Sequence, residues 1–213
     1  MEKLFYKSIL TSNEFEIPKI KWSRFIGNVF HVKNKEDTEK YIKEIWTKYK
    51  DATHNCFAYT YWTNLNFDLF WNIEITPDYF KINDDWEPSN TAWKPILSQI
   101  QWQKLNNILI IVTRYFGGTL LGVGGLIQAY SECAKQTILN SKIQEIELTE
   151  NKKIKFKYDQ TSIVMNLLNK YWWKITKEQH WEFWEINFDI NKWFINTFSK
   201  EIFDQSKWTI SLS

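Results

Sequence analysis

The chain has 213 residues, a net charge of +2 and an isoelectric point near 8.3, so it is long enough for one large domain or two small ones. So weak a net charge argues against a protein that binds nucleic acid through bulk electrostatics, although it does not exclude a local basic patch. Cys56 and Cys133 lie far apart without metal-ligand spacing, and no signal-like N-terminus or apolar run of about 20 residues is present, which predicts a cytosolic, reduced protein without a metal, a cofactor or a membrane partner.

The first part of the chain alternates predicted strands and helices. In chain order, the apolar spacing predicts a strand–turn–strand, an amphipathic helix, a strand and an ambiguous, loop-rich segment, at residues 13–32, 35–50, 53–62 and 68–84. A second helix follows at residues 91–101, then the clearest strand at 107–114 and a third helix at 126–140. Ile108–Val112 is a continuous apolar run, as expected of a central strand that is buried on both faces.

The composition then shifts. Residues 141–155 are charged and strand-prone, which predicts a boundary between a domain of residues 1–145 and a smaller one of residues 146–213. The smaller domain is expected to hold strands and helices in a βαββαβ-like order, at residues 154–158, 162–171, 186–190, 194–203 and 208–212. This order fits a small ferredoxin-like domain, so the predicted fold class is α+β.

The balance of tryptophan and glycine is abnormal. The chain has 13 tryptophans and 6 glycines, whereas average usage would give about 15 glycines. Several tryptophans stand in polar or turn-like surroundings where glycine makes better physical sense, namely Trp62, Trp86, Trp172, Trp173 and Trp208. One hypothesis is that part of this set is glycine, from UGA codons that the source reads as glycine. The other is a truly tryptophan-rich chain from an AT-biased gene.

Three carboxylates lie within four residues, at Asp84, Asp85 and Glu87. They could bind a hard cation or act as acid and base. The alternative is a turn that begins a helix, in which Ser89 or Thr91 caps the helix and the acidic residues favour its dipole. No EF-hand-like spacing is present, so the residues predict no particular metal.

The densest motif is a glycine-rich segment after the strand at 107–114. It begins with Arg114, Tyr115 and Phe116 and contains all but one of the glycines, which are Gly117, Gly118, Gly122, Gly124 and Gly125. Backbone amides in such a segment can hold a phosphate, Arg114 could pair with it, and an aromatic ring could stack on a base. The alternative is a tight strand–loop–helix joint, because the spacing matches neither a P-loop nor a dinucleotide fingerprint.

His54 and Cys56 lie two residues apart on a predicted strand, so their side chains point to the same face. A nucleophile–base pair is conceivable there, but nothing else in the sequence completes a catalytic triad. A buried cysteine beside a hydrogen-bonded histidine is the plainer interpretation. His31 and His180 are isolated in the sequence.

Four of these segments, in this order, resemble the YigZ/IMPACT family. They are Ser23–Gly27, Ala52–Tyr59, Asp84–Pro95 and Arg114–Tyr130, and the resemblance covers about residues 15–140. It implies a first domain similar to domain IV of elongation factor G, a βαβ sandwich that can include a left-handed crossover. The second domain resembles domain V of that factor, which is ferredoxin-like. The family is associated with translation control, and its eukaryotic members bind the ribosome-associated activator of an initiation-factor kinase.

The chain departs from the family pattern at several positions. Family members have glycine at the places of Trp86, Asn90 and Trp93, and also at that of Trp62, which favours the UGA hypothesis. A usual lysine is replaced by Leu120 and a usual arginine by Gln128. Both losses weaken the prediction of an anion site.

Together these features predict a non-catalytic binding protein of translation regulation. Its partner is expected to be the ribosome, structured RNA or a translation factor, with no role for DNA. The predicted binding surface consists of His54, Asp84, Asp85, Glu87, Ser89, Thr91, Arg114, Tyr115, Phe116, Gly117, Gly118, Gly122, Gly124 and Gly125. Two alternatives stay open: an enzyme that uses His54 and the Asp85/Glu87 pair on a small phosphorylated or peptide substrate, and a protein adaptor that binds through its C-terminal domain.

Overall fold

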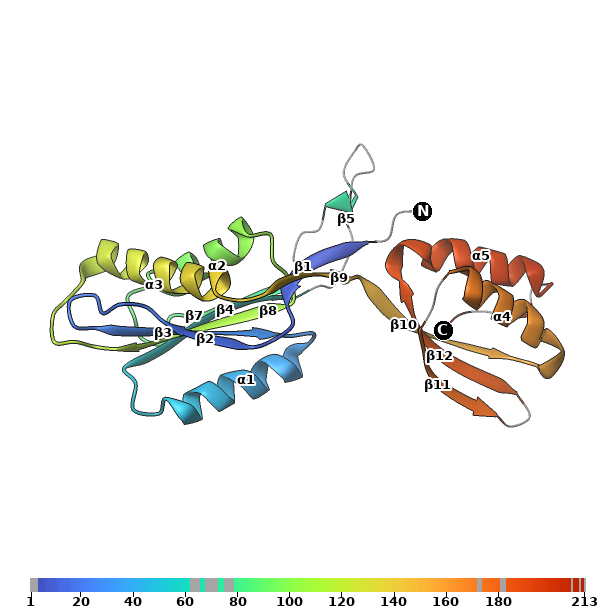
Figure 1. The fold of residues 1–213 in the computed structure, drawn as a ribbon, viewed down its shortest axis with the longest axis horizontal. Coiled ribbons are helices and arrows are strands. Elements are labelled where there is room, and N and C mark those ends of the chain that lie inside the picture. Colours follow the sequence, from blue (N-terminus) through green and yellow to red (C-terminus); the bar gives the residue numbers. More distant parts are fainter. Residues whose placement is uncertain are drawn as a thin grey trace. The chain divides into compact units, whose positions relative to one another are not determined.

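The computed structural model describes residues 4–61, 66–67, 73–74, 79–171, 174–180, 183–207, 209–210 and 212. The chain divides into two compact units (Figure 1). The first runs from Tyr6 to Ile146, and the second from Glu147 to the C-terminus together with the N-terminal residues up to Phe5. This division lies one residue from the predicted boundary and differs from it in assigning the start of the chain to the second unit.

The first unit is built on a five-stranded sheet with the order β2-β3-β8-β4-β7, in which every neighbouring pair is antiparallel. The strands are β2 (Asn13–Glu16), β3 (Arg24–His31), β4 (His54–Tyr61), β7 (Tyr79–Asn83) and β8 (Ile108–Tyr115). The apolar run of β8 lies in the centre of the sheet and is fully buried, as its composition predicted.

Helices cover both faces of this sheet (Figure 1). One face packs against α1 (Lys35–Lys48) through a small cluster that includes Ile45, Phe57 and Leu109. The other face packs against α2 (Trp93–Trp102) and α3 (Gly122–Leu139) through the larger core of the unit. There α3 lies very close to β3, since a Cβ added at Gly27 would stand 1.9 Å from the Thr137 Oγ1 atom. Only glycine fits at this contact.

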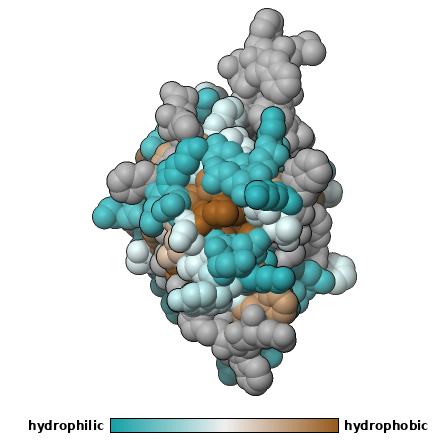
Figure 2. Space-filling view, turned by 90° about the vertical axis from the view of Figure 1, so that its right-hand side faces the viewer, coloured by the Kyte–Doolittle hydropathy of each residue, from teal (hydrophilic) through white to brown (hydrophobic). Residues whose placement is uncertain are grey.

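The second unit has a three-stranded antiparallel sheet with the order β10-β12-β11. Its elements are β10 (Thr149–Phe156), η1 (Tyr158–Gln160), α4 (Thr161–Lys170), β11 (Lys174–His180), β12 (Trp184–Asn191), η2 (Lys192–Phe194) and α5 (Ile195–Gln205). An antiparallel bridge joins Leu212 to Ile154 of β10, on the side where a ferredoxin-like unit has its fourth strand. Figure 2 shows a largely hydrophilic side of the molecule, with a small hydrophobic area among polar side chains.

Two short strand pairs complete the secondary structure: β1 (Phe5–Ile9) with β9 (Ile143–Glu147), and β5 (Asn66–Phe67) with β6 (Ile73–Glu74). Three predictions need correction. The loop-rich segment at 68–84 ends in strand β7, β1 and β11 were not predicted, and α3 begins four residues before the predicted start. Gly122, Gly124 and Gly125 therefore lie in the first turn of a helix and not in a loop.

Candidate functional site

A pocket of about 410 Å³ at one end of the five-stranded sheet is lined by five of the predicted site residues, His54, Glu87, Arg114, Phe116 and Gly122. The other predicted residues do not line it, namely Asp84, Asp85, Ser89, Thr91, Tyr115, Gly117, Gly118, Gly124 and Gly125. His54 of β4 and Arg114 of β8 are direct neighbours in the register of these strands. Glu87 reaches the same place from the loop between β7 and α2, and the start of α3 closes the opposite wall with Val123 and Leu126. Three segments that are far apart in sequence thus meet at this pocket.

A buried ion pair lies at the pocket. An Arg114 guanidinium nitrogen donates to the Glu87 Oε1 atom over 2.5 Å, and both side chains are almost fully buried. Tyr130 of α3 donates its hydroxyl to the same oxygen over 2.8 Å. The guanidinium also lies 5.6 Å from the ring centres of Phe25 and Phe116, a distance at which cation–π attraction contributes. Arg114 is therefore neutralised and held within the protein.

The thiol of Cys56 extends this network inward. Its sulfur lies 3.4 Å from the Tyr130 hydroxyl and 3.0 Å from the Asp84 carbonyl oxygen. Burial raises the pKa of the Cys56 thiol far above its usual value, and the nearby carboxylates raise it further. Burial likewise raises the pKa of Tyr130. Because a thiol attacks only as the thiolate, Cys56 is not arranged as a nucleophile.

His54 is oriented by the backbone. Its Nδ1 atom lies 2.7 Å from the carbonyl oxygen of Asp85, and since a carbonyl can only accept, Nδ1 carries the proton. The Nε2 atom lies 3.7 Å from the Glu87 Oε1 atom, beside the pocket. Asp85 supports this strand a second time, because its carboxylate accepts from the backbone N–H of Asn55 over 2.7 Å.

Asp84 caps the helix that follows. One of its oxygens accepts from the N–H groups of Ala92 and Trp93, over 3.1 and 3.0 Å, and the other accepts from Asn90 N–H over 2.7 Å. The first turn of α2 has no cap from its own N-cap side chain, so Asp84 satisfies donors that helix ends leave open. The predicted caps act differently: the Thr91 hydroxyl donates to the Pro88 carbonyl over 2.5 Å, and Ser89 is exposed and bonded to Asn90.

Two turns in this unit place tryptophan where the backbone favours glycine. Asp85 and Trp86 have φ values of 42° and 67° in a turn closed by a hydrogen bond from Glu87 N–H to the Asp84 carbonyl. Lys21 and Trp22, with φ values of 45° and 68°, form the same kind of turn between β2 and β3. Positive φ at both central residues is typical of turns that contain Asp-Gly or Asn-Gly. Trp86 is 95% exposed and Trp22 is 76% exposed, so neither indole gains much from packing.

The other suspected tryptophans give a mixed result. Asn90, at a position where the family has glycine, also has a positive φ of 67°. Trp93 does not, since it begins α2 and packs against the larger core. Trp62, Trp172, Trp173 and Trp208 lie outside the described residues.

The backbone at Gly117, just after β8, packs closely against the turn that contains Trp22. The Gly117 backbone passes so close that an added Cβ would lie 2.1 Å from the Trp22 carbonyl carbon, and its N–H donates to the Ser23 hydroxyl over 3.1 Å. Gly118 has a φ of 83° in open space. A phosphate at this segment would thus have to displace Ser23 from the Gly117 amide and Glu87 from Arg114.

Tyr115 does not line the pocket. Successive side chains of a strand point to opposite faces, so Tyr115 faces away from Arg114, and it contacts charged neighbours there. Its hydroxyl donates to the Asp51 carboxylate over 3.0 Å, and the Arg24 guanidinium lies 5.2 Å from its ring centre. The pKa of Tyr115 is raised, first by burial of the hydroxyl and then by Asp51. Asp51 and Arg24 thus position this ring.

An exposed apolar surface surrounds the mouth of the pocket. We call it the apolar rim, and it consists of Phe116, Leu120, Val123 and Ile127, which are 45%, 81%, 59% and 41% exposed. No atom of another segment would meet a side chain at Gly122 or Gly124, so the first turn of α3 is bare backbone beside these residues. Residues 116–131 include no charged side chain. The rim is therefore apolar and electrically neutral.

Within the described part of the chain, no group of three or more His, Cys, Asp or Glu side chains could hold a metal ion. No helix in that part is both long and apolar enough to cross a bilayer. Both cysteines are buried free thiols. The site consists of a buried, hydrogen-bonded ion pair below an apolar opening.

Sequence reasoning missed several residues that complete the site. Tyr130 appeared only as the end of the Arg114–Tyr130 segment and within the helix predicted at 126–140, although a buried tyrosine hydroxyl needs a partner and could have indicated the network. Ser23 and Thr53 lie in the segments that resemble the family but were not predicted as site residues, yet they accept from Gly117 N–H and Phe116 N–H. The rim positions Val123 and Ile127 were indicated only by lying next to the glycines.

Known proteins similar to this chain cover most of its length. The Impact N-terminal domain family matches residues 21–138. An IMPACT family member of Haemophilus influenzae is 31% identical over 204 residues, which cover 91% of this chain and 93% of that protein. IMPACT family member YigZ of Escherichia coli is 27% identical over 199 residues, or 92% of this chain and 91% of YigZ. IMPACT family member YvyE of Bacillus subtilis is 34% identical over 143 residues, 67% of this chain but only 60% of YvyE.

A crystal structure of a hypothetical protein has the same fold, with a TM-score of 0.69 and 24% identity over 100% of this chain and 97% of the other. At that identity the likeness establishes the fold alone. The family match, in contrast, spans more than half of the chain and includes every residue of the pocket described above. The chain therefore belongs to the IMPACT family.

Proposed function

We propose that this chain is a non-catalytic binding protein of translation regulation, and that the apolar rim and the pocket below it contact a protein of the translation machinery. That partner is a translation factor or a ribosomal protein, and structured RNA is the competing outcome. The implied likeness to domains IV and V of elongation factor G agrees with this proposal, but fold analogy alone carries little weight. The argument therefore depends on the site.

The observation that carries the proposal is that the charged groups of the site are paired with one another while its apolar groups are exposed. Within the described part of the chain, one exception is the Arg114 Nε atom, which is buried without a hydrogen-bond partner. Glu87 is used by Arg114 and Tyr130, and the Asp84 carboxylate is used by the N–H groups of the helix that it caps. Leu120 and Val123, in contrast, expose most of their side chains. Apolar surface around a concave opening is typical of a contact site for a protein.

The charge of the rim favours a protein partner over RNA. Affinity for nucleic acid comes mainly from cations at phosphates, and residues 116–131 supply none. Arg114, the cation that lines the pocket, is buried and paired with Glu87. A phosphate backbone would gain little at this surface, whereas an apolar side chain of a partner could fill the pocket.

Co-sedimentation with ribosomes and translation factors from the native source tests the proposal. Val123→Ser removes part of the rim, and Leu139→Ser is the matched control, because Leu139 is 55% exposed at the other end of the same helix. We expect Val123→Ser to weaken co-sedimentation at least about tenfold and Leu139→Ser to leave it unchanged. Binding through RNA would fall steeply with salt, whereas binding through the rim should persist. The proposal would be rejected if Val123→Ser and Leu139→Ser co-sediment equally well, or if the native protein associates with neither ribosomes nor translation factors.

One observation favours an enzyme as the second candidate. His54 has a fixed Nδ1 proton, and its Nε2 atom faces Glu87 beside a pocket of about 410 Å³, an arrangement that suits a general base. A small phosphorylated or peptide substrate would then stabilise the protein against heat. If phosphorylated metabolites and short peptides do not raise the melting temperature, the enzyme candidate is rejected and the binding function remains. The same holds if His54→Gln leaves any turnover unchanged.

A further inference from the structure

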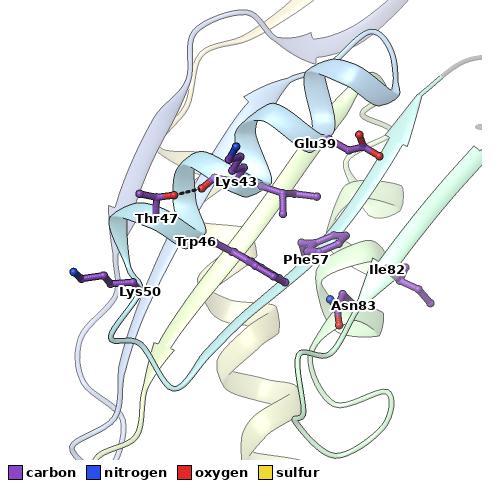
Figure 3. A pocket seen from close by; sticks show the side chains of 9 residues that line it. Glu39, Lys43, Trp46, Thr47, Lys50, Phe57, Ile82 and Asn83 are labelled. Carbon is purple, nitrogen blue, oxygen red and sulfur yellow. Dashed lines mark hydrogen bonds between the residues drawn. The ribbon is translucent and has the colours of Figure 1, made fainter.

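A second concave surface lies on the opposite face of the sheet, away from the pocket at Arg114. It is a groove of about 710 Å³ between helix α1 and the end of strand β7 (Figure 3). Phe57 of β4 lies at its floor, and Asn83 of β7 is the register partner of Phe57 on the same face. The groove exists because α1 packs over β8 and β4, and no helix of the described part of the chain covers the β7 side of this face.

One face of α1 forms the wall of the groove. Its residues Glu39, Lys43 and Trp46 recur at intervals of four and three along the chain, so they share one side of the helix. Lys50 lies two residues beyond the end of α1 and also lines the groove. Trp46 is 41% exposed and extends from α1 toward Phe57 (Figure 3). An exposed indole beside a buried ring offers a flat apolar contact with a defined direction.

The other wall is an edge of the sheet. Among the strands that the structure describes, β7 pairs with β4 alone and ends the five-stranded order. An edge strand offers a row of N–H and C=O groups to an additional strand. A groove between a helix and such an edge is the setting in which domains of the PDZ type bind extended peptides.

The charges of the groove select among occupants. Lys43 and Lys50 form no ion pair with any residue in the described part of the chain, whereas Glu39 pairs with Lys35 over 3.5 Å. The groove thus offers two available cations beside its apolar wall. Helix α1 as a whole carries four lysines and four acidic residues, so it lacks the cationic excess that a nucleic-acid backbone requires.

We propose that this groove binds an extended, acidic segment of a protein partner. The segment adds as a strand to the outer edge of β7 and lays a large apolar side chain against Trp46 and Phe57. An acidic side chain on either side of it faces Lys43 and Lys50. This second site is independent of the function proposed for the rim, because the two surfaces use different residues and opposite faces of the sheet.

Fluorescence anisotropy with labelled peptides tests the proposal. The probe is a capped peptide of about eight residues, long enough to pass β7, with a central leucine between two aspartates. Two comparison ligands are tested beside it: the same peptide with lysine in place of aspartate, and a single-stranded oligouridine. We expect only the acidic peptide to bind, and its binding should slow hydrogen exchange at backbone amides of β7.

Three variants locate the binding. Trp46→Ala should weaken the acidic peptide about tenfold or more, and Lys43→Glu about threefold to tenfold. Lys40→Glu is the matched control with the same charge change on the same helix, since Lys40 is exposed and does not line the groove, and it should change nothing. Lys43→Glu also covers the case in which Trp46→Ala fails to fold.

Several results would overturn the proposal. Preference for the basic peptide or for oligouridine would show a different ligand class. Equal losses with Lys40→Glu and Lys43→Glu would indicate long-range attraction without a site. No binding of the acidic peptide at millimolar concentration would count against the groove itself. None of these results bears on the rim, whose test uses Val123→Ser.

Discussion

The acidic turn at 84–91 and the glycine-rich segment at 116–125 both stand out in the sequence, but they have different roles. In the turn, Asp84, Asp85 and Glu87 each have partners inside the protein. In the glycine-rich segment, Leu120 and Val123 face solvent. A dense motif can thus stabilise the fold or bind another molecule. Only the contacts of its side chains distinguish these two roles. Substitutions of the acidic residues of the turn should lower stability, and substitutions of the exposed apolar residues of the segment should lower binding.

The largest effect is expected at Glu87. Glu87→Gln removes the countercharge of a buried arginine, which should lower the free energy of unfolding by about 3 to 5 kcal/mol. Urea denaturation measures it, with Glu39→Gln as the exposed control. The double variant Glu87→Leu with Arg114→Met should recover much of the loss, because no unpaired charge remains. A double variant as unstable as the sum of the singles would contradict a coupled pair.

Asp84 should come next. Asp84→Ala leaves three backbone N–H groups at the start of α2 without their acceptor, and we expect a loss of about 2 kcal/mol. Asp84→Asn keeps an acceptor oxygen and should lose less. The same denaturation experiment compares them, and amide exchange in α2 should quicken in the alanine variant alone. Equal losses of stability in Asp84→Ala and Asp84→Asn would mean that the charge of Asp84, and not its capping of the helix, is responsible.

Glycine substitutions should have opposite signs at different tryptophans. Trp86→Gly and Trp22→Gly relieve a left-handed backbone, which should raise stability by about 0.5 to 1 kcal/mol after the entropy of glycine is counted. Trp102→Gly is the control, because Trp102 is 81% exposed but lies at the end of helix α2, where glycine should lower stability by up to about 1 kcal/mol.

Peptide mass spectrometry on the protein from its native source tests the UGA hypothesis at the same positions. Glycine at 86 and 22 would mean that both turns have the residue that their backbone favours. Tryptophan at both would leave the strain in place as a property of the native chain.

The smallest change in stability is expected at the rim. Leu120→Ser exposes no new cavity, since Leu120 is already 81% exposed, so the free energy of unfolding should stay within about 0.5 kcal/mol. Binding to the partner should nevertheless fall. A large loss of stability in this variant would mean that the rim packs inside the protein and would weaken the contrast with the acidic turn.

Much of the fold could be predicted because its main elements have strong local patterns. The strand at 107–114 and the helix at 126–140 are examples, and both elements were confirmed. The start of α3 was wrong because glycine disfavours helices locally, while packing of Leu126 and Tyr130 in the core overrides that preference. Strand β7 was missed since its neighbours gave no clear period. The sequence motifs were enough to assign His54, Glu87 and Arg114 to one site. They could not predict that Arg114 pairs with Glu87, because this pairing depends on burial, which no local sequence pattern reveals.

The strand order has a consequence for how the chain folds during synthesis. Strands β3 and β4 both pair with β8, which lies between them in the sheet but follows them in the chain. Until residues 108–115 leave the ribosome, two strands rich in apolar side chains have no common partner, and pairing over such sequence distances is slow. Strands β3 and β4 can pair earlier with β2 and β7, but their edges toward β8 stay unpaired until more than half of the chain has been made. This is the interval in which aggregation competes with folding.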